Sequence, residues 1–132
     1  MGLTIKMAVL GAVAFMVLDG VWLGLLMKNF YRDQLAPIAR LGNGGMAPNW
    51  PAAFVVYALL GTGIALFVIP RAPSVPLAAA YGALFGLVVY GVYDFTNYST
   101  LRQWPFALVF ADVAWGVVAS AACAAAVRIA IR

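Results

Sequence analysis

Three of the four acidic residues in this sequence, Asp19, Asp94 and Asp112, lie inside long apolar runs. A carboxyl group in such a run can hold or release a proton, accept hydrogen bonds or bind a cation. An aspartate at the middle of a membrane helix costs about 2.5–3.5 kcal/mol, so it usually faces the protein interior or a wet cavity. The chemistry of these acids is therefore the first guide to function, and Asp94 is the strongest candidate among them.

The three aspartates are expected in the half of the membrane that faces the long loop of the chain. Asp19 precedes Lys28 by nine residues, which corresponds to about 13 Å along a helix. Asp112 follows Trp104 by eight residues, about 12 Å from the same side, and Asp94 lies about 6 Å from the end of its run. No lysine or arginine lies within the apolar runs, which excludes an internal salt bridge.

Three states of these carboxyl groups remain open. In the first, the carboxyl groups are protonated. In the second, they are ionised and accept hydrogen bonds from neutral donors. In the third, they bind a cation or a cationic ligand. Helical spacing favours local donors: each tryptophan follows its acid at i+3, and Asp94 has tyrosines at i−4 and i+4 (Tyr98) and an asparagine at i+3. The plainer interpretation, interhelical hydrogen bonds between protonated acids, gains only about 0.6 kcal/mol per bond. The expected binding site comprises Asp94, Asp112, Asp19, Trp22, Trp115, Tyr90, Tyr93 and Asn97.

The elements that must position these side chains are membrane-spanning helices. The sequence is 66% hydrophobic and 9% charged, whereas soluble domains carry about 25% charged residues. Uniform runs near the roughly 20 apolar residues of a helical crossing exclude barrel strands, and the first run is a retained span rather than a signal peptide. We predict an all-α integral membrane four-helix bundle forming a single transmembrane domain over residues 1–132, with spans at about 7–27, 51–69, 76–98 and 104–127 and a long loop at 28–50.

Several patterns predict how these spans pack. Short links make spans two and three, and spans three and four, antiparallel neighbours. Gly20-x-x-x-Gly24 and Gly82-x-x-x-Gly86 permit close helix contact. Residues 28–40 are amphipathic, which predicts either an interfacial helix or an ordered loop covering the acid layer. Spans one and four share the pattern D-x-x-W, which by itself does not establish a duplication.

Composition also excludes several classes of function. The chain has no histidine, which excludes zinc–histidine sites, histidine-ligated haem and serine–histidine–aspartate catalysis. Its one cysteine, Cys123, cannot form an internal disulfide. The basic residues flank the apolar runs instead of covering one face, so no nucleic-acid partner is expected. No metal site is predicted, and the sequence names no cofactor.

The lysines and arginines divide evenly between the two sides of the membrane, so the positive-inside rule gives a tie. We expect both termini in the cytoplasm.

The stretch YGVYDFTNYSTLRQWP, with LDGVWLG upstream and FADVAWG downstream, resembles an uncharacterised family of small bacterial inner-membrane proteins. The resemblance extends from the first span to Trp115, and its most specific part is the pattern Y-D-x-T-N-Y-x-T-L-x-x-W-P. It implies a four-span, multi-pass protein of the bacterial inner (cytoplasmic) membrane, without an established activity. An association of relatives with lipid-modifying enzymes implies a lipid-linked role.

The expected function is that the acid and aromatic residues bind a lipophilic molecule, such as a lipid, a fatty acyl chain or an isoprenoid, in an accessory role. One alternative is a small proton-coupled transporter of lipophilic cations, by analogy with the small multidrug resistance family. Others are a membrane isomerase or cyclase that uses an acid as proton donor, and a structural subunit of a membrane complex. Nothing in the sequence identifies a nucleophile, so enzyme activity stays open. The expected partners are membrane lipids and either a second copy of the chain or a larger membrane complex.

Overall fold

The computed structural model describes all 132 residues, which are mostly helical. Helix α1 (Gly2–Val21) continues into a π-helical turn at Trp22–Leu26, and the short helix α2 (Lys28–Leu35) follows. The rest of the long loop carries a small antiparallel hairpin of strands β1 (Leu41–Gly42) and β2 (Gly45–Met46).

The second half of the chain contains three further helices. Helix α3 (Trp50–Gly63) continues through a π-helical turn at Ile64–Val68 and a 3-10 turn at Ile69–Arg71. Two longer helices follow, α4 (Val75–Thr100) and α5 (Phe106–Ala130). The predicted all-α membrane bundle is confirmed, because four helical stretches are long and apolar enough to cross a membrane. These stretches are Gly2–Leu26, Trp50–Arg71, Val75–Thr100 and Phe106–Ala130.

Local sequence explains where two of these helices begin. The Asn49 side chain accepts a hydrogen bond from the Ala52 N–H at the start of α3, and Ser74 does the same for the Leu77 N–H at the start of α4. Each cap is followed by a proline in the first turn, where the missing N–H carries no penalty.

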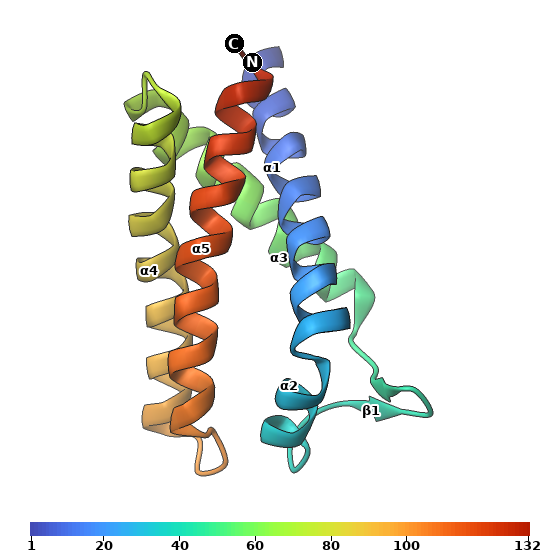
Figure 1. Ribbon diagram of the computed structural model, residues 1–132. Coiled ribbons are helices and arrows are strands. Elements are labelled where there is room, and N and C mark those ends of the chain that lie inside the picture. The colour runs from blue at the N-terminus through green and yellow to red at the C-terminus, as the bar shows by residue number, and fades with distance from the viewer.

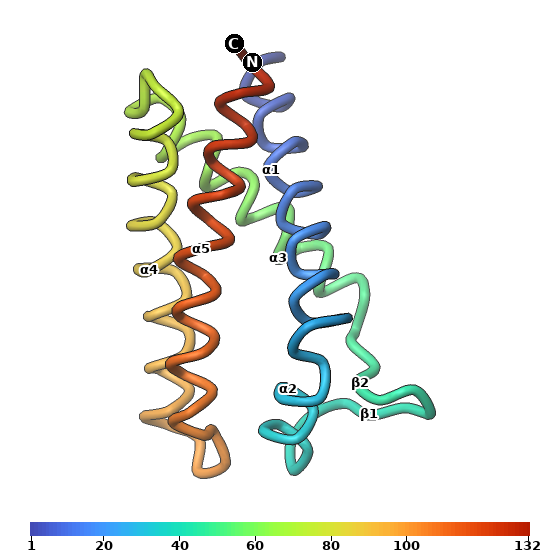
Figure 2. Tube along the Cα trace, in the orientation of Figure 1, coloured from blue at the N-terminus to red at the C-terminus, as the bar shows by residue number.

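The helices form two pairs that converge at the end carrying both termini. α4 and α5 run antiparallel and side by side along their whole length, and α3 crosses behind α1 (Figure 1, Figure 2). α1 and α5 lie close together near the termini and diverge towards the loop end, where α2 turns back beneath α1 (Figure 1). Polar side chains near the loop end therefore lie where the two helix pairs separate.

Glycines set the close approach of α4 and α5. A Cβ atom on Gly86 would collide with the Gly116 carbonyl oxygen and would lie 2.6 Å from the Ser120 hydroxyl oxygen. A Cβ atom on Gly82, one turn earlier, would also collide with the backbone of α5, at the Ser120 carbonyl oxygen. The predicted contact at the second glycine pair is confirmed.

The other glycine pair makes no such contact. Gly20 and Gly24 have no atom within 4 Å of where a Cβ would lie, so they make no close helix contact within the chain. α1 instead meets α3 at Gly61, whose Cβ would collide with the Ala8 carbonyl oxygen. Because Gly61 has no side chain, the backbones of α1 and α3 come close together at this crossing.

The predicted pairing of spans two and three is therefore only partly correct. α4 meets the second span near its end, where the ring of Phe85 fills the space beside Gly63. The rest of α3 packs on α1, although the link between α3 and α4 is short.

The apolar core lies in the half of the bundle near the termini. Phe15, Ile64 and Cys123 are fully buried there, and the Cys123 thiol donates a hydrogen bond to the Gly11 carbonyl oxygen. Only 25 of 132 residues are buried, so most large apolar side chains face outward, as lipid contact requires. The acid layer occupies the opposite, loop-facing half.

Candidate functional site

The two D-x-x-W patterns meet across the antiparallel helices α1 and α5. The indole rings of Trp22 and Trp115 are stacked, with centroids 4.5 Å apart and planes 2° from parallel. The Trp115 indole N–H donates a 2.7 Å hydrogen bond to the Asp19 carboxyl group. The tryptophan of the second pattern is therefore a hydrogen-bond donor to the aspartate of the first.

The second half of this arrangement passes through a tyrosine. The Trp22 indole N–H donates to the Tyr31 hydroxyl over 3.0 Å, and that hydroxyl donates to the Asp112 carboxyl group over 2.7 Å. The local i+3 donors predicted from the sequence are thus incorrect for both tryptophans. The Trp115 N–H points across to α1, and the Trp22 N–H points to Tyr31 of α2 instead of to the acid of its own helix.

Tyr31 reaches this position because of how α1 ends. The π-helical turn at Trp22–Leu26 finishes at Met27, whose backbone leaves the helical region, and the chain then folds back as α2. Tyr31 is the one buried residue of α2, with 5% of its surface exposed. The two predictions for residues 28–40 are each met in part, because residues 28–35 form a short helix and Tyr31 contacts the acid layer.

Burial raises the pKa of the Tyr31 hydroxyl above its usual value, and the negative charge of Asp112 raises this pKa further. Tyr31 therefore keeps its proton at neutral pH and acts as a donor to Asp112. Its fixed protonation state makes it a structural link between the long loop and α5.

Asp19 has a further neighbour from α3. The hydroxyl of Tyr57 lies beside the Asp19 carboxyl group. Sequence reasoning missed both Tyr57 and Tyr31 as site residues. Two features of the sequence could have indicated them. Tyr57 is the lone tyrosine of an apolar span, and Tyr31 is an aromatic residue in an amphipathic segment.

Asp94 differs from the other two acids. It is 0% exposed, and neither of its carboxyl oxygens has a hydrogen-bond partner. The Asp112 carboxyl group and the Trp104 indole lie next to it, outside hydrogen-bond geometry. The Trp104 indole N–H is also buried and has no acceptor. Asp94 therefore lies beside one of the other two acids, Asp112, and is itself without a hydrogen-bond partner.

The local donors predicted for Asp94 are directed elsewhere. The Tyr90 ring packs on Gly116 of α5. Asn97 lies beside the Tyr93 hydroxyl, and the Tyr98 ring packs against Phe106, with centroids 5.2 Å apart. These three side chains therefore make their contacts with other residues and not with the Asp94 carboxyl group.

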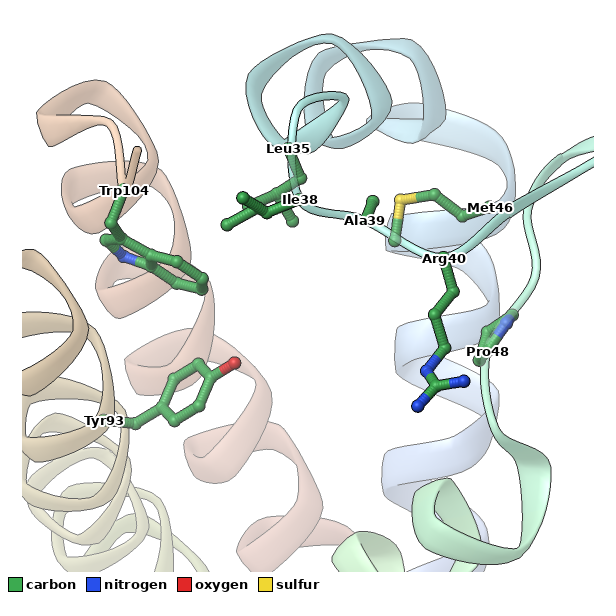
Figure 3. A pocket seen from close by; sticks show the side chains of 8 residues that line it. All are labelled: Leu35, Ile38, Ala39, Arg40, Met46, Pro48, Tyr93 and Trp104. Carbon is green, nitrogen blue, oxygen red and sulfur yellow. The ribbon is translucent and has the colours of Figure 1, made fainter. Parts of the chain in front are cut away.

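An open pocket of about 230 Å³ lies between the long loop and the loop-side ends of α4 and α5 (Figure 3). Six of its eight lining residues are hydrophobic. Trp104 and Tyr93 pack edge to face, with centroids 5.7 Å apart, and form one wall. Trp104 is therefore shared between the pocket and Asp94. The pocket is lined by Leu35, Ile38, Ala39, Arg40, Met46, Pro48, Tyr93 and Trp104.

Of the residues predicted to bind a ligand, only Tyr93 lines this pocket. Asp19, Asp112, Trp22 and Trp115 are paired with one another and with Tyr31. Chemically, the arrangement offers an unpartnered acid and an unpartnered N–H donor behind an aromatic wall. No group of three or more metal-ligating side chains is assembled in the structure.

The sequence profile of a family described as predicted membrane protein (DUF2177) matches residues 4–129. Neither the curated proteins nor the solved structures contain a significant match. The family description assigns no activity, so function must be argued from the site.

Proposed function

We propose, for a chain that belongs to the predicted membrane protein family DUF2177, that it binds a lipophilic molecule from the bilayer. The ligand enters the pocket beside Trp104, whose indole also lies next to the buried carboxyl group of Asp94. The carrying observation is the buried carboxyl group of Asp94, which has no partner although it lies next to an equally unpartnered N–H group.

Energetics support a functional role for this pair. A buried polar group without a hydrogen bond costs about 1–3 kcal/mol of stability, and native structures contain few of them. The Asp94 carboxyl group and the Trp104 indole N–H both carry this cost, directly behind the wall of the pocket. Such a cost is tolerated most often at functional sites.

The size and lining of the pocket support an amphiphile as the ligand. Pockets for drug-sized molecules usually enclose about 300–1,000 Å³, whereas this pocket holds about 230 Å³ and is open. It suits a polar head and a few adjoining carbons, with the rest of an acyl or isoprenoid chain in the surrounding lipid. An accessory role in lipid metabolism is consistent with such partial enclosure.

The experiment is to identify by mass spectrometry the lipids that copurify with the protein, in parallel for Asp94→Leu and Trp104→Phe. We expect a specific lipophilic species in the wild type and its loss from both variants. Trp50→Phe is the matched control, because Trp50 is 59% exposed and lies outside the pocket. Equal lipid content in all four proteins would overturn the proposal.

A second candidate, a proton-coupled carrier of lipophilic cations, is favoured by the neighbouring carboxyl groups of Asp94 and Asp112. Neighbouring acids within a membrane are typical of the proton relays of pumps and transporters. The test is uptake of tetraphenylphosphonium into proteoliposomes driven by a pH gradient. This candidate requires uptake in the wild type and none in Asp112→Asn.

The acid-catalysed isomerase or cyclase and the structural subunit remain predictions from the sequence alone. We also propose the bacterial inner membrane as the location, with both termini in the cytoplasm. Both chain ends lie at the same end of the bundle (Figure 1), which supports a shared side. Reporter fusions at each end test this topology.

A further inference from the structure

Arg40 is a charged residue in the pocket wall that has no acidic partner. The one ion pair in the structure joins Arg32 and Asp33, both exposed. The Arg40 side chain extends from the loop, and its guanidinium group faces the open space across from the Tyr93 hydroxyl (Figure 3). A lone cation at the edge of an apolar pocket attracts an anion.

The backbone at Arg40 is held in place by the hairpin. Its carbonyl oxygen accepts a 2.7 Å hydrogen bond from the Ala47 N–H, directly outside the pairing of β1 with β2. The guanidinium group thus projects from a fixed point of the loop. Only its side-chain rotamers have to be ordered when an anion binds.

The surrounding charge favours an anionic ligand as well. Besides Arg40, the loop end carries Lys28, Arg32 and Arg102, against the single exposed acid Asp33, which is already paired. None of the aspartates lines the pocket, so Arg40 is the one charged residue in its lining. The pocket therefore has one cationic side chain in a mostly apolar lining, at an end of the bundle with an excess of positive charge.

We propose that the pocket binds a single-chain amphiphile with an anionic head, a carboxylate or a phosphate, and that Arg40 binds the head. This inference rests on the proposed function and names its ligand class. The planar guanidinium group matches the paired oxygens of either head. The first methylene groups lie against Ile38, Met46 and the Trp104 ring, and the Tyr93 hydroxyl donates a further hydrogen bond. A volume of about 230 Å³ favours one chain over two.

The test uses probes that share a chain and differ in the head. Dansyl-undecanoic acid is bound to the full-length protein in zwitterionic nanodiscs and detected by energy transfer from tryptophan. Myristate, myristyl phosphate, myristyl alcohol and myristyl trimethylammonium then compete, and acetate and inorganic phosphate serve as anions without a chain. We expect both anionic amphiphiles to compete at least about tenfold better than the alcohol, and the free anions not to compete.

Variants of the loop cations assign the effect to Arg40. We expect Arg40→Gln to weaken binding of the acid about ten- to hundredfold and to leave the alcohol unaffected. Arg40→Lys should restore part of the affinity. Arg32→Gln removes an equal charge outside the pocket and should change affinity less than about threefold.

The outcomes separate the two proposals. If the alcohol competes as well as the acid and Arg40→Gln binds normally, the anionic head is refuted, while binding of a lipophilic molecule stands. If no amphiphile displaces the probe, or if the probe does not bind, both proposals fail. Competition by the free anions alone would show an ion site without a lipid and would also overturn the inference.

Discussion

Trp22 and Trp115 are stacked with their ring planes 2° from parallel, and each indole N–H leads to the acid of the opposite helix. One path is direct, to Asp19, and the other runs through Tyr31 to Asp112. This stack and its hydrogen bonds join the first membrane helix to α5. Its hydrogen bonds and its ring contact are therefore expected to hold the loop half of the bundle together.

Trp115→Phe should lower the free energy of unfolding by about 1–3 kcal/mol, because it removes the N–H donor to Asp19 while keeping a ring for stacking. The measurement is equilibrium unfolding in mixed detergent micelles, followed by circular dichroism. Trp50→Phe, at an exposed tryptophan, is the control and should change this free energy by less than about 0.5 kcal/mol. Equal stability of the two variants would contradict the role of the hydrogen bond.

Asp94→Leu and Asp19→Leu should act in opposite directions on stability. The first removes a buried carboxyl group that has no partner, so the melting temperature should stay constant or rise. The second leaves the Trp115 N–H buried without an acceptor and should cost about 1–3 kcal/mol. Thermal melting of both variants in one detergent decides this, and a strong loss of stability in Asp94→Leu would falsify the description of Asp94 as unpartnered.

Gly86→Ala should destabilise the protein by about 1–3 kcal/mol, because the new methyl group meets the backbone of α5 and α4 has to move away. Gly91→Ala is the matched control on the same helix, since nothing lies within 4 Å of its Cβ position. That control should be neutral or stabilising by up to about 1 kcal/mol, from helix propensity. Thermal unfolding of the two variants, measured side by side, tests the contact.

Alkaline pH should destabilise the protein partly through Tyr31. Its raised pKa means that the folded chain holds the proton more tightly than the unfolded chain. The resulting stabilisation is fully present below about pH 10, the ordinary tyrosine value, and is lost as the pH rises above it. Tyr31→Phe has no proton to lose, so its stability should fall less steeply with pH. Unfolding curves at increasing alkaline pH compare the two, and identical slopes would rule out this contribution.

The sequence predicted the layer of acids and the helices that carry it. Hydropathy located the spans, and counting residues along them placed Asp19, Asp94 and Asp112 in one half of the membrane. Both predictions rest on one-dimensional distances along regular helices. For that reason they did not depend on knowing how the helices pack.

The pairing of side chains could not be predicted in the same way. Spacing along one helix suggested that Trp22 and Trp115 serve the acids of their own patterns, whereas helix crossing exchanges them. The contribution of Tyr31 depends on the π-helical turn that ends α1, and no local sequence signal specifies that turn. Arg40 entered the pocket wall through the folding of the long loop, which a positive-inside count treats only as a charge.

The hydrogen bond between Asp19 and Trp115 links the first membrane helix to the last one. During synthesis α1 enters the bilayer before α5 has been translated, so Asp19 first lies in the membrane without the Trp115 donor. The arrival of the final helix is therefore the step that closes the loop half of the bundle. A chain halted before that step keeps Tyr57 of α3 beside Asp19 but lacks the Trp115 donor, so an intramembrane acid is left only partly satisfied.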